Sequence, residues 1–141
     1  MIIKAISLKQ PWATLVILGA KVYETRSWKA NYRGPLAIHA SRSFTEQLAR
    51  LCAHEPYRSV LQRAGYKCGW DLPRGVILGT VELVEVYATD ELDPRTLSAT
   101  ELAFGDFRPR RFAFQLANPK AWDPPLKMAG QLNIFEINVE A

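Results

Sequence analysis

Three charged residues near the N-terminus have the types and spacing to build one polar site. Lys21, Glu24 and Arg26 follow Gly19 in the pattern G-x-K-x-x-E-x-R. If residues 22–28 form a strand, Glu24 and Arg26 share a face, because strand side chains alternate. A carboxylate and a guanidinium placed in this way pair or are braced by neighbours, and the long Lys21 stem reaches over the same surface. The alternatives are a polar cleft or a structural ion pair beside a solvated lysine.

A histidine on the next predicted strand, residues 36–41, allows two interpretations. Alternation puts His39 on one face with Ala37 and Ser41. As a core residue, His39 is satisfied by a backbone carbonyl. As a cleft residue, it lies near Glu24 with Ser41 at the rim, where an imidazole donates to a base edge or shuttles a proton.

Basic and aromatic residues also alternate in three short clusters. They comprise Trp28, Lys29, Tyr32 and Arg33; Tyr66, Lys67, Trp70 and Arg74; and Phe107, Arg108, Arg110, Arg111 and Phe112. Single-stranded nucleic acid is bound by this mixture, because cations meet phosphates and rings stack on bases. The alternative is that the rings are core and the cations merely solvated. Arg108 to Arg111 is the expected surface patch, because Pro109 keeps it out of regular structure.

The elements that position these residues are predicted from periodicity and breakers. Strands are expected over 2–7, 22–28, 36–41, 76–87, 111–116 and 132–139, and helices over 12–18, 44–55 and 57–64. A helical turn is possible near 97–102, and 119–130 is expected to be a proline-rich loop. Gly79 predicts a bulge inside a strand. The pattern predicts an α+β fold: a mixed β-barrel of about six strands with two or three flanking helices.

Composition limits the functional classes. The 141 residues suit one domain spanning 1–141, and the contents of 48% hydrophobic and 23% charged residues are typical of globular proteins. The net charge of +4 permits an anionic partner. No apolar run is long enough to span a membrane and no signal peptide is apparent, so a cytoplasmic location without membrane attachment is expected. The two cysteines match no zinc pattern, and no cofactor fingerprint occurs, so neither a metal nor an organic cofactor is expected.

The motif and its flanks resemble the ASCH domain family. The flanks are the S-x-x-Q-P-W stretch of Ser7, Gln10, Pro11 and Trp12, the following YRGPLAIHAS, and the later RRFAFQLANP. The resemblance covers nearly the whole chain and implies a PUA-like β-barrel. It also implies a basic cleft that binds RNA, expected to be single-stranded, or a nucleotide-like ligand.

We assign a set of ligand-binding residues to this cleft, partly from the resemblance and partly from the strand faces and the basic–aromatic clusters. They are Ser7, Gln10, Trp12, Lys21, Glu24, Arg26, Trp28, Arg33, Ser41 and Lys127. Lys127 is included because many relatives carry a basic residue just before the glycine of the C-terminal loop, where this chain has Ala129 before Gly130. The oligomeric state is left open.

Catalysis in the same cleft is the alternative, with Lys21, Glu24 and His39 as candidate catalytic residues. Some ASCH-like proteins are similar to ribonucleases and others to amidohydrolases that act on modified cytidine-type nucleosides. The amidohydrolase-like members carry Thr three residues after the lysine, where this chain has Glu24 with Thr25 adjacent. Glu82 and Glu85 are both candidates for a distant carboxylate. A non-catalytic adaptor that binds partners through its loops is a third possibility.

Overall fold

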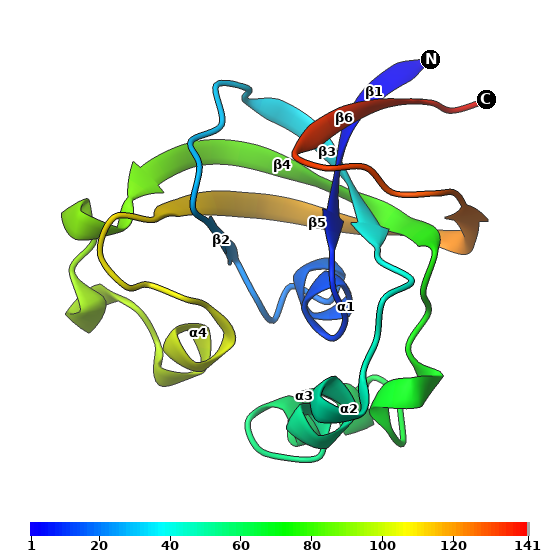
Figure 1. Ribbon diagram of the computed structural model, residues 1–141, viewed down its shortest axis with the longest axis horizontal. Coiled ribbons are helices and arrows are strands. Elements are labelled where there is room, and N and C mark those ends of the chain that lie inside the picture. The colour runs from blue at the N-terminus through cyan, green and yellow to red at the C-terminus, as the bar shows by residue number, and fades with distance from the viewer. Residues whose placement is uncertain (141) are drawn as a thin grey trace.

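One curled six-stranded sheet frames the protein. The computed structural model describes residues 1–140 (Figure 1). The strands are β1 (Ile2–Leu8), β2 (Tyr23–Arg26), β3 (Gly34–Ala40), β4 (Val76–Ala88), β5 (Phe112–Lys127) and β6 (Ile134–Asn138). They lie in the order β2-β5-β4-β3-β1-β6, and β1 and β3 form the one parallel pair of this described sheet. Because β2 and β6 are the two edges, the sheet is a half-barrel with an opening between them.

Four short α-helices lie on the concave side of the sheet (Figure 1). They are α1 (Trp12–Ile17), α2 (Glu46–Cys52), α3 (Tyr57–Arg63) and α4 (Ala99–Phe104). Three 3-10 turns, η1 (Gly69–Asp71), η2 (Thr89–Glu91) and η3 (Pro94–Thr96), complete the connections. The sequence predicts three α-helices, and α4 occupies the region where it indicates a single turn. The α+β prediction of a mixed, barrel-like fold is therefore confirmed, with one more helix than expected.

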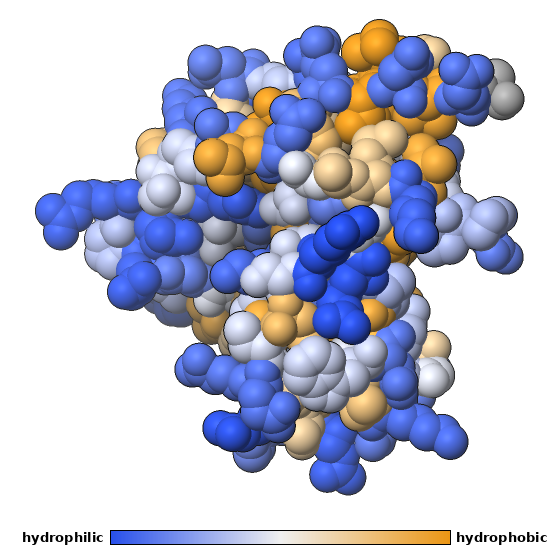
Figure 2. Space-filling view, turned by 45° about the vertical axis from the view of Figure 1, so that its right-hand side comes forward, coloured by the Kyte–Doolittle hydropathy of each residue, from blue (hydrophilic) through white to orange (hydrophobic). Residues whose placement is uncertain are grey.

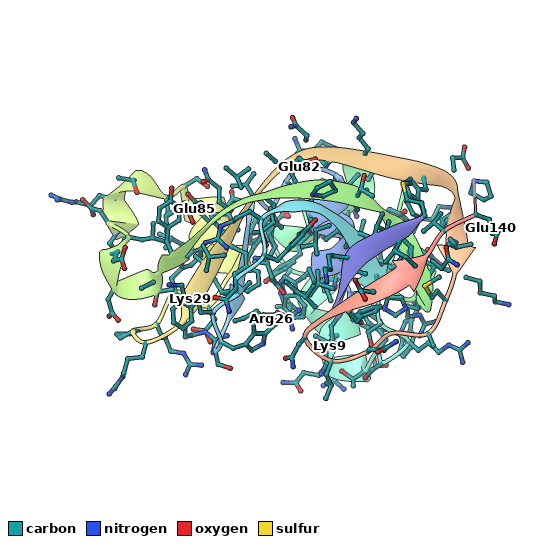
Figure 3. All side chains as sticks on the ribbon, turned by 90° about the horizontal axis from the view of Figure 1, so that it is seen from above. Lys9, Arg26, Lys29, Glu82, Glu85 and Glu140 are labelled. Atoms are coloured by element: carbon teal, nitrogen blue, oxygen red, sulfur yellow. The ribbon has the colours of Figure 1, made fainter. Side chains whose placement is uncertain are left out.

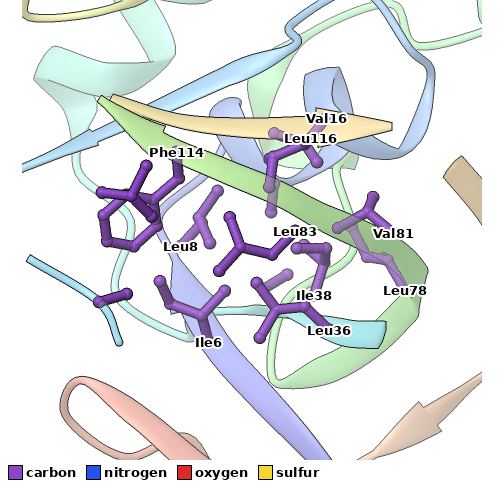
Figure 4. Close-up of a cluster of buried hydrophobic side chains, with 14 residues drawn as sticks. Ile6, Leu8, Val16, Leu36, Ile38, Leu78, Val81, Leu83, Phe114 and Leu116 are labelled. Carbon is purple, nitrogen blue, oxygen red and sulfur yellow. The ribbon is translucent and has the colours of Figure 1, made fainter. Parts of the chain in front are cut away.

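Helix α1 is the centre of the packing. Pro11 precedes its first turn, and Gly19, with φ +77°, follows its last, the conformation that favours glycine after a helix. One face places Val16 in the main core, among buried side chains of β1, β3, β4 and β5 (Figure 4). The other face places Leu15 in a second cluster with Tyr57, Leu61 and Phe104. Each fully buried Leu or Phe contributes roughly 1.5–3 kcal/mol, so α1 joins the helices to the sheet.

The predicted loop over 119–130 is wrong up to residue 127, because β5 continues to Lys127. Prolines are tolerated there because β5 pairs with β2 only over 112–115, which leaves the remaining edge free of a ladder partner. The irregular register against β4 accommodates Pro119 and the Pro124–Pro125 pair. The predicted bulge at Gly79 is confirmed. Its φ is +155°, and a Cβ there would lie 2.0 Å from the Lys120 carbonyl oxygen, so only glycine fits.

Candidate functional site

The main cavity lies where the half-barrel is open. Its volume is about 540 Å³, within the range of ligand-binding clefts. The lining side chains come from β1, α1, β2, the α4 region and the loop before β6. They include Ser7, Lys9, Trp12, Glu24, Thr25, Arg26, Ser41, Tyr57, Asp106, Arg111, Gln131, Leu132 and Asn133. The cavity thus lies beside the edge strand β2 and the loop that leads into the other edge strand, β6.

Arg26 crosses the opening of the half-barrel. Its Nε donates to Glu24 Oε2 at 3.0 Å, and one Nη donates to the Ser7 carbonyl at 2.9 Å. The bond to Ser7 joins β2 to β1, strands that are not neighbours in the sheet. The other terminal nitrogen, Nη1, makes no hydrogen bond within residues 1–140 and is available to a ligand. Figure 3 shows Arg26 on the same side of the molecule as Lys9.

Lys21 lies behind this wall rather than in the cavity. Its side chain is 1% exposed, its Nζ donates to the Tyr23 carbonyl, and Glu24 Oε1 is 3.8 Å away. Burial lowers the pKa of Lys21, while the charges of Glu24 and Glu101 act in the opposite direction. Lys21 therefore acts on any ligand through Glu24 and not by direct contact.

A carboxylate from α4 holds the start of β2 in place. Glu101 is buried and accepts hydrogen bonds from the Val22 and Tyr23 amides, at 3.0 and 3.2 Å. Ser98 caps the helix by accepting from the Glu101 amide. The Ser98-x-x-Glu101 spacing is typical of a capping box, but here the glutamate side chain reaches another element, 79 residues away in sequence.

The opposite wall of the cavity also carries paired charges. Asp106 binds Arg108 through two hydrogen bonds of 2.8 and 2.7 Å, and Arg111 lies 3.3 Å from the same carboxylate. The Arg108 bond is the main reason that the pKa of Asp106 falls to about 2. The Asp106 amide donates to Thr25 Oγ1 at 3.0 Å, which fastens this wall to β2. Cations thus slightly outnumber carboxylates around the cavity.

A serine–histidine pair lines a second, adjoining cavity of about 460 Å³. Ser7 and His39 are register partners on β1 and β3, with Ser7 Oγ 2.8 Å from His39 Nδ1. His39 Nε2 lies 2.7 Å from the Met128 carbonyl, which only accepts, so Nε2 carries a proton. In the neutral imidazole, Nδ1 then accepts the Ser7 hydroxyl hydrogen. His39 is 2% exposed and is satisfied by a backbone carbonyl, as the first of the two interpretations stated.

The structure brings only part of the predicted site together. The predicted residues that line the main cavity are Ser7, Trp12, Glu24, Arg26 and Ser41. Ser7, His39 and Ser41 line the second cavity. Neither cavity is lined by Gln10, Lys21, Trp28, Arg33 or Lys127.

Local contacts explain the residues that lie elsewhere. Gln10 is fully buried and bonds Thr14 and the Pro73 carbonyl. Trp28 packs on Phe114 with ring centroids 5.3 Å apart, and Arg33 pairs with Glu85 on the surface at 2.7 Å. Lys127 pairs with Val76 at the far end of β5. Figure 3 places Glu82 and Glu85 away from Lys9, and neither glutamate lines the main cavity.

Several cavity residues are not apparent from the sequence. Lys9 and Tyr57 have no distinguishing pattern, and Asp106 lies outside the strands and helices that the sequence predicts. Arg111 is predicted as part of an exposed patch, but it is only partly exposed and faces the cavity. These residues meet through contacts between distant segments, which short-range spacing does not reveal.

Within residues 1–140, no three His, Cys, Asp or Glu side chains gather closely enough to hold a metal ion. None of the helices in this part of the chain is long and apolar enough to cross a membrane.

Comparisons with known proteins agree with the sequence motif. The profile of the ASCH domain matches residues 6–128. Activating signal cointegrator 1 of Mus musculus is 28% identical over 127 residues, 83% of this chain and 21% of that protein. The Homo sapiens protein of the same name is 35% identical over 82 residues, 57% of this chain and 14% of that protein. The chain thus spans about a fifth or less of these relatives.

Solved structures show the same fold. The crystal structure of ASCH from Zymomonas mobilis has a TM-score of 0.58 and 14% identity, covering 96% of this chain and 87% of that one. A mutant form of the same Zymomonas mobilis protein gives an equal score and identity, covering 96% and 89%. With the profile covering most of the sequence, the half-barrel and the motif on β2 have one explanation: this chain belongs to the ASCH domain family.

Proposed function

We propose that the main cavity binds one nucleotide unit of single-stranded RNA. The observation that supports this is the free Nη1 of Arg26 in a cavity that also contains Lys9 and the rings of Trp12 and Tyr57. Trp12 and Tyr57 pack edge to face, with ring centroids 6.5 Å apart. Proteins usually bind an unpaired nucleotide through cations that contact its phosphate and aromatic rings that stack on its base.

The paired carboxylates give the site its geometry. Glu24 fixes the Arg26 guanidinium through Nε, which aims the remaining N–H groups in a defined direction. A planar guanidinium held in this way keeps Nη1 in a fixed position from which it can donate to a phosphate oxygen. Membership of the ASCH family agrees with this proposal, since the resemblance implies an RNA-binding cleft.

The test is a fluorescence-anisotropy titration of a labelled single-stranded RNA octamer at low salt. We expect Arg26→Ala to weaken binding roughly 10- to 100-fold, because hydrogen bonds to charged groups contribute about 1.5–3 kcal/mol. Arg26→Lys keeps the charge and is expected to recover part of the affinity. Arg33→Ala is the control, because it removes an arginine outside both cavities.

Two results would overturn the proposal. One is the absence of RNA binding by the unaltered protein at low salt. The other is equal affinity of Arg26→Ala and Arg33→Ala, provided that urea unfolding shows both variants to be folded. That check is needed because Arg26 also joins β2 to β1.

The Ser7–His39 pair supports a second function, hydrolysis in the same hollow. An acyl-transfer step begins when Ser7 Oγ attacks an acyl carbon and His39 Nδ1 takes the hydroxyl proton. His39 then passes that proton to the leaving amine, and water releases the acyl group from Ser7. The Met128 carbonyl holds the imidazole in the required orientation.

Hydrolysis is tested with an N-acylated cytidine and, separately, with RNA. We expect Ser7→Ala and His39→Ala to abolish amide cleavage while leaving the Arg26-dependent RNA affinity within about threefold. No turnover by the concentrated unaltered protein, or turnover that survives Ser7→Ala, would exclude the serine as nucleophile.

A further inference from the structure

A second group of rings and cations lies outside the main cavity. Phe44 and Trp70 meet edge to face, with centroids 4.9 Å apart. The Arg74 guanidinium carbon lies 5.6 Å from the Phe44 centroid and 5.5 Å from that of Trp70, within cation–π distance. Trp70 is 45% exposed, although it is a large ring. With Arg42, these residues form what we name the Trp70 platform.

Two glycines let this platform assemble. A Cβ on Gly69 would lie 2.9 Å from the Phe44 ring and 3.0 Å from Cys52 Sγ, so only glycine lets Phe44 pack under η1. A Cβ on Gly75 would lie 2.9 Å from Arg42 Cγ and Nε, so the Arg42 side chain crosses this backbone closely. The Gly75 amide donates to the Ala40 carbonyl at 2.7 Å, which fastens the two loops together.

The cations of the platform are not neutralised. Within residues 1–140, neither Arg42 nor Arg74 forms an ion pair, although Asp71 lies in the same loop. Both arginines are exposed. Positive charges that have no carboxylate partner and lie next to an exposed ring suit an anionic chain that also carries rings.

The platform is continuous with the proposed binding site. Arg42 lines the second cavity, which shares Ser7, Ser41, Gln131 and Leu132 with the main cavity. Arg42 also packs against the backbone of Gly75, the residue that follows Arg74 in the platform. Figure 2, which brings this side of the molecule forward, shows a strongly hydrophilic group of side chains in the middle of the face.

We propose that the Trp70 platform is a base-stacking subsite for the same RNA strand that places one nucleotide in the main cavity. Trp70 stacks on an unpaired base, while Arg42 and Arg74 contact the phosphates between the platform and the cavity. The ligand is single-stranded, because a paired base does not present its face to a protein ring. This inference rests on the proposed function and defines the ligand as a strand longer than one or two nucleotides.

The test compares RNA lengths. A labelled dinucleotide and a labelled decamer of the same base are titrated against the unaltered protein, Trp70→Ala and Trp70→Phe. We expect Trp70→Ala to weaken decamer binding roughly 5- to 150-fold, the effect of about one lost stacked base. Dinucleotide binding is expected to stay within about twofold, and Trp70→Phe to recover much of the decamer affinity. Lys120→Ala is the charge control for a matching Arg74→Ala, because Lys120 lies at a different cavity.

The outcomes separate the two proposals. If Arg26→Ala weakens decamer binding and Trp70→Ala does not, the platform is not a subsite, although the cavity proposal stands. If decamer binding depends on Trp70 but not on Arg26, the cavity proposal fails and the platform binds RNA alone. Equal binding of single-stranded and duplex RNA, both insensitive to Trp70→Ala, would overturn the stacking role.

Discussion

The charged residues of β2, Glu24 and Arg26, form with the buried Lys21 what we call the β2 wall. This wall and the Trp70 platform use the same residue types in opposite ways. On β2, Glu24 is 12% exposed and contacts both Lys21 and Arg26, so each cation has a carboxylate. On the platform, Arg42 and Arg74 are exposed and lack such partners within residues 1–140. Rings accompany both groups, but Trp12 is half-buried between two hydrophobic clusters, whereas Trp70 is open on the surface.

The difference separates residues that orient a ligand from residues that attract it by charge. A partly buried, paired guanidinium such as that of Arg26 is held in one orientation, but its charge is largely compensated, so it favours discrimination between ligands. An exposed, unpaired arginine exchanges its counterions for phosphates and contributes mainly to the affinity for any strand. In the proposed function, the cavity would therefore select the nucleotide and the platform would retain the chain.

The largest expected effect concerns the pairing on β2. Glu24→Ala removes the carboxylate that contacts the buried Lys21 and leaves only the weaker influence of Glu101, and breaking a buried ion pair costs about 3–5 kcal/mol. We expect a loss of that order in the free energy of unfolding, measured by urea denaturation at neutral pH. Glu136→Ala is the control, because its partner Lys4 lies on the surface at 3.2 Å, where a pair contributes under about 1 kcal/mol. Similar losses in the free energy of unfolding of both variants would show that the buried charges beside β2 stabilise the protein no more than a surface ion pair does.

A smaller effect concerns the titration of Lys21. Burial lowers its folded-state pKa below the ordinary value of 10.5. Between these two pKa values, the unfolded chain binds more protons, so the contribution of Lys21 to the free energy of unfolding rises as pH increases. We expect the unaltered protein to gain stability relative to Lys21→Met across this alkaline window, in urea unfolding measured from pH 7 to about 10.5. A stability difference between the two proteins that does not change with pH would contradict the burial of a charged lysine.

The smallest expected effect is on the salt dependence of binding. Each phosphate neutralised on a single strand changes the slope of log K against log salt by about 0.7. Arg74→Ala is therefore expected to reduce the magnitude of the slope for the decamer by about that amount. Arg33→Ala is expected to leave the slope unchanged, because Glu85 already neutralises Arg33. Equal slopes for Arg74→Ala and the unaltered protein would place Arg74 outside the phosphate path.

Much of the fold could be predicted from local patterns. All six strands lie near their predicted positions, because β-branched and aromatic runs with glycine or proline at their ends are local signals. The bulge at Gly79 is predictable for the same reason. The extent of β5 is not, because its prolines become compatible with a strand only when the edge that they face has no partner.

The candidate site could be predicted only in part. The sharing of one face by Glu24 and Arg26 follows from strand alternation, and their 3.0 Å contact agrees with it. The position of Lys21 does not follow from the same pattern. A lysine after a helix-ending glycine is usually solvated, but here the side chain is buried and the charge of Glu101, on α4, acts on it.

By itself, the sequence determined the approximate positions of the strands, the bulge at Gly79 and the charged pair on β2, because these depend on residues close together along the chain. Only the tertiary structure decided which charges are buried, which rings remain open and where the cavity lies. Those features depend on contacts between segments such as residues 22 and 101, or 26 and 7. Alternation says which side chains share a face, but only packing determines which face is covered.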